Sequence, residues 1–313
     1  MMEAAVQQEE TTKEQDGVES GISERTEPMD SMDEVRKQLG EKGLEQRGSD
    51  FVLRSRLFLH AKRATKTSTT QLQYLLVVDF EATCEAEQGP GSYEQEIIEF
   101  PAVLVDARMK TIVGEFHSYC RPIKARISPF CTKLTGITQE MVDAAETFAE
   151  VLVRFDEFLD GFGLLTNPNW CIVTDGSFDL ALFLALQCKI CKLPLPPYAR
   201  MFVHLPKLFQ WVYLSSDPAK HRANMREMLA HFEMELEGRH HSGIDDSRNL
   251  AKIVIQMLND QVRFRPTDIL LVGEKDEKKP LCVKVIPVNK AKWNRVHKSL
   301  MKNNVKRRPQ PPA

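Results

Sequence analysis

Two periodicities of apolar positions run along this chain of 313 residues. Short apolar runs rich in β-branched residues predict strands over 75–79, 97–105, 112–119, 170–174 and 200–204. Apolar positions three and four apart predict helices over 128–134, 148–160, 177–188, 222–236 and 245–258. The first three strands follow one another through short turns and are expected to be antiparallel, whereas the later ones alternate with helices and are expected to be parallel. The pattern therefore predicts an α/β fold with a mixed five-stranded sheet and flanking helices.

The segments around this sheet differ from it in charge. Residues 1–34 hold eleven acids and two bases, so we expect residues 1–30 to form a disordered acidic segment. Residues 31–64 show two short helical patterns with scattered bases, and 65–71 are a linker. Residues 72–262 form the α/β domain, and 263–313 are a basic C-terminal extension. Eight bases and no acid in 288–308 are typical either of a nucleic-acid arm or nuclear address, or of a solvated tail.

Two carboxylates follow the first strand, two residues apart. Because side chains alternate along a strand, Asp79 and Glu81 point the same way. Like charges held together at the end of a buried strand repel each other unless a cation offsets them, and hard divalent cations prefer carboxylate oxygens. The pair alone leaves two interpretations open, a metal site or a charged turn.

Further acids are expected to converge on a metal site from other elements. Asp179 lies in the first turn of a predicted helix, where it could equally complement the helix dipole. His241 precedes Asp246 by five positions at the entrance to the last predicted helix. Asp175 is better explained as a turn or cap residue, and Asp245 as the cap of the last predicted helix.

Taken together, this order resembles that of the DEDDh 3′–5′ exonucleases, which have an RNase H-like fold. The resemblance covers roughly 72–262 and is closest to the exoribonuclease family that trims histone mRNA 3′ ends and restrains RNA interference. It rests on residues 79–85 (DFEATCE), 96–101 (EIIEFP), 134–139 (LTGITQ), 174–179 (TDGSFD) and 238–247 (GRHHSGIDDS).

The resemblance implies a role for each matching residue. It implies two Mg²⁺ ions, with Mn²⁺ as a substitute, a catalytic role for Glu81 besides ligation, and His241 as general base. The implied metal ligands are Asp79, Glu81, Asp179 and Asp246. The implied substrate-binding residues are Phe80 and Ala82 through their backbone, Leu134, Thr135, and Phe178, which stands where the family commonly has Trp. The family often has Pro at the position of His240, so two adjacent histidines stand here.

The segment 31–64 resembles a SAP module, a small helical unit that binds nucleic acid and precedes the nuclease domain in longer family members. Arg47, Arg54 and Arg56 are its candidate nucleic-acid contacts. The stretch 49–51 (SDF) replaces one that usually includes a Lys, which weakens the expectation of a phosphate contact. The alternative is a generic charged helical hairpin.

The expected activity is release of nucleoside 5′-monophosphates from RNA 3′ ends, in histone mRNA stem-loops, small interfering RNA or ribosomal RNA. The alternatives are a non-catalytic RNA-binding scaffold and a DNA exonuclease. Expected partners are RNA with an accessible 3′ end, stem-loop RNA at the SAP-like module, and ribosomal or RNA-silencing complexes. Seven singly spread cysteines indicate a reducing compartment, and no apolar run approaches the ~20 residues that span a bilayer. A cytoplasmic location is therefore expected, with nuclear or nucleolar entry permitted by residues 306–308 (KRR).

Overall fold

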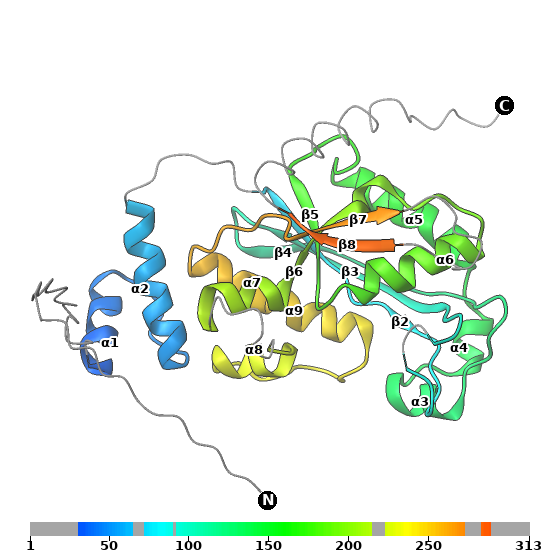
Figure 1. The fold of residues 1–313 in the computed structure, drawn as a ribbon, viewed down its shortest axis with the longest axis horizontal. Coiled ribbons are helices and arrows are strands. Elements are labelled where there is room, and N and C mark those ends of the chain that lie inside the picture. Colours follow the sequence, from blue (N-terminus) through cyan, green and yellow to red (C-terminus); the bar gives the residue numbers. More distant parts are fainter. Residues whose placement is uncertain (1–30, 65–71, 90–91, 215–222, 273–282, 289–313) are drawn as a thin grey trace, which may run out of the picture.

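The computed structural model describes residues 31–64, 72–89, 92–214, 223–272 and 283–288. A mixed β-sheet lies at the centre of these residues, with helices on both of its faces (Figure 1). The expected acidic head, the linker and the basic residues of the tail lie outside the described residues. Among those described, no helix is both long and apolar enough to cross a membrane.

The strands follow the order β2-β3-β1-β5-β6-β7-β8, and β4 pairs with β3. Only β1, β5 and β6 are parallel neighbours; the other pairs are antiparallel. The strands are β1 (Tyr74–Val77), β2 (Glu81–Ala82), β3 (Ile97–Asp106), β4 (Thr111–Tyr119), β5 (Trp170–Thr174), β6 (Met201–His204), β7 (Asp268–Val272) and β8 (Val283–Pro287). The five predicted strands are thus present in the predicted directions.

Ten α-, 3₁₀- or π-helical segments are described besides two that precede the sheet. The first two are α1 (Met32–Glu41) and α2 (Asp50–Ala64). The others are α3 (Pro129–Thr135), α4 (Gln139–Asp143), α5 (Phe148–Gly161), the π-helix η1 (Asp179–Leu184), α6 (Ala185–Ile190), the 3₁₀-helix η2 (Pro197–Arg200), α7 (Leu205–Phe209), the π-helix η3 (Gln210–Leu214), α8 (Met225–His231) and α9 (Gly243–Asn259).

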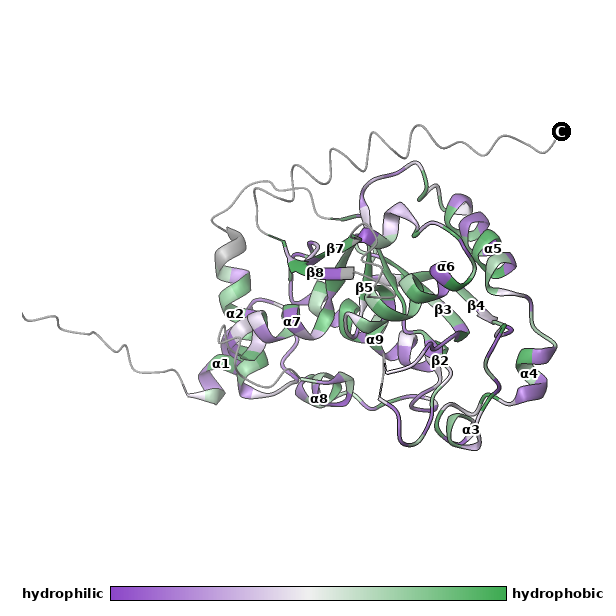
Figure 2. Ribbon diagram, turned by 45° about the vertical axis from the view of Figure 1, so that its right-hand side comes forward, coloured by the Kyte–Doolittle hydropathy of each residue, from purple (hydrophilic) through white to green (hydrophobic). Residues whose placement is uncertain are grey.

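Alternation along β1 divides the apolar core into two layers. Leu75 and Val77 pack with α8 and α9 on one face, whereas Leu76 and Val78 pack with α5 and η1 on the other. Helix α5 accordingly carries both hydrophobic and hydrophilic residues (Figure 2). By the same alternation Asp79 continues the series that faces α9. The strand pattern therefore directs this carboxylate toward the helix that carries Asp246.

The sheet is larger than predicted. Strand β7 pairs with β6, and β8 pairs with β7, so residues 268–272 and 283–287 extend the same sheet. The predicted domain end at 262, and a separate extension starting at 263, are therefore wrong for these residues. The predicted helix over 222–236 is shorter, since α8 ends at His231, and the helix over 177–188 begins as a π-helix.

Helix α2 packs against the core of the α/β domain, and α1 packs against α2 (Figure 1). Val52 of α2 is fully buried in the same core layer as α9. Arg56 is 1% exposed and its Nε lies 2.5 Å from Oδ1 of Asp260, at the end of α9. Ser49 donates its backbone N–H to the carbonyl of His231 at 2.8 Å. Helix α2 is thus attached at both α8 and α9.

Candidate active site

The carboxyl ends of the parallel strands meet at one edge of the sheet. The register pairs Val77 with Val173 and Val173 with Val203, so β1, β5 and β6 end side by side. Asp79 follows β1 there, and Glu81 lies in β2 opposite Glu99 of β3. Open parallel sheets bind ligands at this edge.

Three predicted metal ligands offer oxygens to one point. Ligand atoms of Asp79, Glu81 and Asp246 all lie within 4.8 Å of one another. Asp179 adjoins them, because its Oδ1 accepts the backbone N–H of Phe80 at 3.0 Å. The structure therefore brings together all four predicted carboxylates, from the segment after β1 and from β2, η1 and α9.

Burial and mutual repulsion raise the pKa values of these acids. The pKa of Asp79 lies well above its usual range because the group is buried beside Asp179 and Glu81. Burial raises the pKa of Asp179 to about 7 and, together with the charge of Glu99, raises that of Glu81. Acids that repel one another in this way are stabilised in their charged form by a divalent cation. The donor set, all oxygen, fits hard cations.

His241 lies next to these acids in an unusual backbone conformation. Its φ is +64°, and its backbone N–H donates to Oδ2 of Asp246 at 2.8 Å. Burial and the neighbouring His240 lower the pKa of His241 below 6.5. The imidazole is therefore neutral at pH 7 and able to accept a proton.

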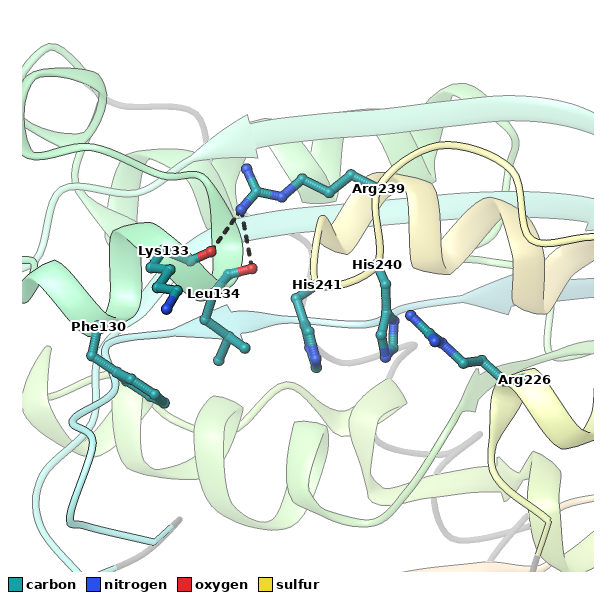
Figure 3. A pocket seen from close by; sticks show the side chains of 7 residues that line it. All are labelled: Phe130, Lys133, Leu134, Arg226, Arg239, His240 and His241. Atoms are coloured by element: carbon teal, nitrogen blue, oxygen red, sulfur yellow. Dashed lines mark hydrogen bonds between the residues drawn. The ribbon is translucent and has the colours of Figure 1, made fainter.

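A cavity of about 510 Å³ opens beside the two histidines (Figure 3). It is lined by Phe130, Lys133, Leu134, Arg226, Arg239, His240 and His241. Arg239 donates to the backbone carbonyls of Lys133 and Leu134 at 2.9 and 3.3 Å, which ties the last turn of α3 to the histidine loop. Cationic side chains around a space next to the acids suit a polyanionic substrate.

Comparison with known proteins identifies the family to which this chain belongs. Residues 76–254 match the family model described as exonuclease (RNase_T). The chain is 37% identical over 251 residues to the mouse (Mus musculus) "3'-5' exoribonuclease 1", covering 78% of this chain and 72% of that protein. The chain belongs to the DEDDh exonuclease family.

Two solved structures support the DEDDh assignment. One, of histone mRNA stem-loop recognition by a 3′-exonuclease, has a TM-score of 0.63 and 33% identity, covering 71% of this chain and 93% of that chain. The other, the nuclease domain of the DEDDh protein 3'hExo bound to rAMP, has a TM-score of 0.59 and 36% identity, covering 64% and 100%. The predicted family and RNase H-like fold are thereby confirmed, and the family implies divalent metal ions.

One carboxylate near the DEDDh acids was missed by the sequence analysis. Burial and the charges of Asp179 and Asp246 raise the pKa of Asp175 to about 7. Its Oδ1 is buried and has no hydrogen-bond partner among the described residues. Asp175 directly follows β5, which ends beside β1. Its position directly after a parallel strand was the sequence feature that indicated a place at the site. The glycine that follows it led instead to the prediction of a turn residue.

The start of α9 depends on a second residue that was missed. Buried Glu99 accepts the backbone N–H groups of Gly243 and Ile244 at 2.9 and 3.1 Å, and its Oε1 lies 2.8 Å from Nε2 of His117. Asp245, predicted to cap this helix, instead accepts the backbone N–H of Arg239 at 3.0 Å from within the first turn. Glu99 on β3 thus sets where Asp246 lies.

The predicted substrate residues differ in how the structure places them. Leu134 lines the cavity, and Phe178 is 56% exposed and therefore accessible. Thr135 is buried; its hydroxyl donates to the carbonyl of Cys131 at 2.9 Å and accepts the N–H of Ile137 at 3.1 Å, so its side chain holds the turn after α3, and its contact with substrate stays a prediction. The N–H of Phe80 is already donated to Asp179, which leaves its carbonyl for the predicted ribose contact. The backbone of Ala82 pairs with Ile97, and its contact with substrate stays a prediction.

The three predicted arginines of the N-terminal helices also differ. Arg56 is buried and ion-paired with Asp260, so its predicted contact with nucleic acid is wrong. Arg47 is exposed, with its Nε 3.2 Å from Oε1 of Glu45. Arg54 is half-buried. Two helices are confirmed in this segment, while its likeness to a SAP module stays a prediction.

Proposed function

We propose that the protein is a Mg²⁺-dependent 3′–5′ exoribonuclease that releases nucleoside 5′-monophosphates. The observation that carries the proposal is the convergence of four carboxylates with a neutral histidine at one edge of the sheet. The choice of RNA is supported by the mouse relative, whose name describes an exoribonuclease, and by the rAMP bound in a solved relative. The all-oxygen donor set favours Mg²⁺ or Mn²⁺ over softer cations.

The acids and the histidine of the site have different roles in the reaction. Asp79, Glu81, Asp179 and Asp246 would hold two cations, which when bound would lower the pKa of a water and offset charge on the phosphate. His241 takes the proton of the attacking water, for which its lowered pKa keeps it neutral. Attack in line on the last phosphodiester then leaves the terminal nucleotide with a 5′-phosphate.

The cavity supplies the groups that orient the substrate. Arg226, Arg239 and Lys133 offer positive charge to the phosphate backbone, and Leu134 and Phe130 offer apolar contact. The helices α1 and α2, fixed to α8 and α9, would hold any stem-loop bound there at a constant distance from the acids. A histone mRNA stem-loop is the favoured substrate because a solved relative recognises one.

The test uses 5′-labelled single-stranded RNA and DNA of the same sequence, with Mg²⁺ or with EDTA. We expect stepwise shortening of RNA from its 3′ end, mononucleotide products, and no reaction with EDTA or with Asp79→Asn. Asp160→Asn, which changes an exposed acid at the end of α5, is the matched control and should act like the unmutated protein. RNA binding without Mg²⁺-dependent cleavage would identify a scaffold, and a DNA rate equal to the RNA rate would identify a DNA exonuclease.

A further inference from the structure

A second group of metal-binding atoms overlaps the carboxylate site. Ligand atoms of His240, His241 and Asp246 lie within 4.8 Å of one another. The group contains two imidazoles and one carboxylate, whereas the site formed with Asp79 and Glu81 contains oxygen donors alone. Imidazole favours first-row transition metals such as Zn²⁺ over Mg²⁺. Asp246 belongs to both groups, so the two compete for it.

The spacing of these atoms suits a small tetrahedral ion. Nδ1 of His240 lies 3.2 Å from Oδ2 of Asp246. Two ligands about 2.0–2.1 Å from a tetrahedral Zn²⁺ stand about 3.3 Å apart, so this pair already has the separation of one edge of such a site. A site of two histidines and one carboxylate with an open position is an established arrangement for zinc.

The backbone at His241 brings the two imidazoles to the same side. Consecutive side chains of an extended chain point in opposite directions. The positive φ of His241 overrides this, and the rings stack with centroids 3.9 Å apart and planes at 27° (Figure 3). The His241 N–H fixes Asp246 against the same turn at 2.8 Å. The three ligand groups therefore lie on one side of the turn, and the two stacked rings bind one ion after rotating about their side-chain bonds so that their in-plane lone pairs converge.

Some charges around the histidine turn oppose a bound cation and others attract one. Arg226 and Arg239 line the same cavity and oppose a cation, and Figure 3 shows Arg226 pointing toward His240. Asp79 and Glu81 have ligand atoms within 4.8 Å of Asp246 and attract one. Ligation by two nitrogens, rather than net charge, is what would select the ion.

We propose that His240, His241 and Asp246 form a binding site for Zn²⁺ or a similar transition-metal ion, and that its occupancy inhibits the enzyme. An ion there takes the lone pair with which His241 accepts a proton and one carboxylate of the Mg²⁺ site. Zinc would then act as an inhibitor that competes with Mg²⁺ for Asp246. Binding is independent of the proposed function, whereas inhibition rests on it.

The first experiment measures binding without substrate. Zn²⁺ is titrated by calorimetry into the full chain in excess Mg²⁺, and Co²⁺ serves as a probe whose visible absorption distinguishes tetrahedral nitrogen ligation from octahedral oxygen ligation. We expect one Zn²⁺ per chain, tetrahedral Co²⁺ bands, and at least about tenfold weaker binding in His240→Gln and His240→Asn. His60→Gln, on α2, is the control and should bind as the unmutated chain does. Equal Zn²⁺ affinity in the unmutated chain and both His240 variants overturns the site.

The second experiment measures inhibition, with each variant compared with its own rate in Mg²⁺ alone. We expect Zn²⁺ to inhibit the unmutated enzyme, and the inhibitory concentration to rise at least about tenfold in His240→Gln. Saturating Zn²⁺ that leaves the RNA cleavage rate unchanged would overturn the inhibitory part. A chain that binds Zn²⁺ but cleaves no RNA under any metal would instead refute the proposed function, and the binding result would stand.

Discussion

Gly243, the first residue of α9, lies where a side chain has no room. A Cβ added there would lie 2.6 Å from the carbonyl oxygen of Asp79, 3.0 Å from Cγ of Pro101 and 3.2 Å from Cδ of Glu99. Ordinary contact begins near 3.4 Å, so Gly243→Ala requires the helix and the strand end to separate by about 0.8 Å (3.4 − 2.6). The atoms in the way belong to a backbone, a ring and a buried carboxylate, so they cannot rotate aside.

This separation moves the metal ligands apart. The new Cβ displaces Asp79 itself, and Asp246 lies on α9 three residues after Gly243. A displacement near 1 Å at reacting groups costs about 10²-fold in rate, and overpacking costs about 1–3 kcal/mol of stability. We therefore expect Gly243→Ala to lower kcat on RNA by 10- to 100-fold, on the same estimate, while urea unfolding shows a folded protein. Gly161→Ala, at the end of α5 with no atom within 4 Å of its new Cβ, should keep full kcat. Full kcat in Gly243→Ala would refute the steric coupling.

Three further predictions concern charged groups. Arg56→Met leaves Asp260 buried without its cation, so we expect urea unfolding to show a loss of about 3–5 kcal/mol, while the salt dependence of RNA binding stays the same; a shallower dependence would restore Arg56 as a phosphate contact. Because His241 must be neutral and its pKa lies below 6.5, the rate of RNA cleavage should fall only as the pH drops below about 6.5, and a limb centred above 7 would contradict its role. Asp175 and Asp179, with pKa values of about 7 against 3.8 ordinarily, bind protons in the folded state that the unfolded chain has lost. Without metal, stability should therefore fall as the pH rises from about 4 to 7, and calorimetry in two buffers should show protons released when Mg²⁺ binds.

Patterns within one element predicted much of the fold. The β-branched run before Asp79 and the spacing of His241 and Asp246 are local signals, and the structure places these residues together. The directions of the five central strands followed from the lengths of their connections. These features depend on periodicity and spacing, which a single sequence contains.

The role of a charged residue depended on partners that the sequence does not show. Arg56 resembled a surface base because its spacing matched other bases, yet Asp260 pairs with it from 204 positions away. Asp175 resembled a turn residue because Gly176 follows it, yet its carboxylate is buried near Asp179 and Asp246. The strands β7 and β8 were missed because the pairing of β7 with β6, and of β8 with β7, brings together segments that no local pattern connects.

Glu81 and Glu99 illustrate how partners assign such roles. They are opposite each other on β2 and β3, so the two carboxylates start from nearly the same position on the sheet. Glu99 accepts two backbone N–H groups from α9 and contacts His117, which together satisfy its charge inside the protein. Glu81 instead lies beside Asp79 and Asp246. Its burial, and then the negative charges of Glu99 and Asp246, raise its pKa. A satisfied carboxylate holds a helix in place, whereas one surrounded by acids needs a cation, so the difference between the structural and the metal-binding glutamate arises from the partners that neighbouring elements bring to each.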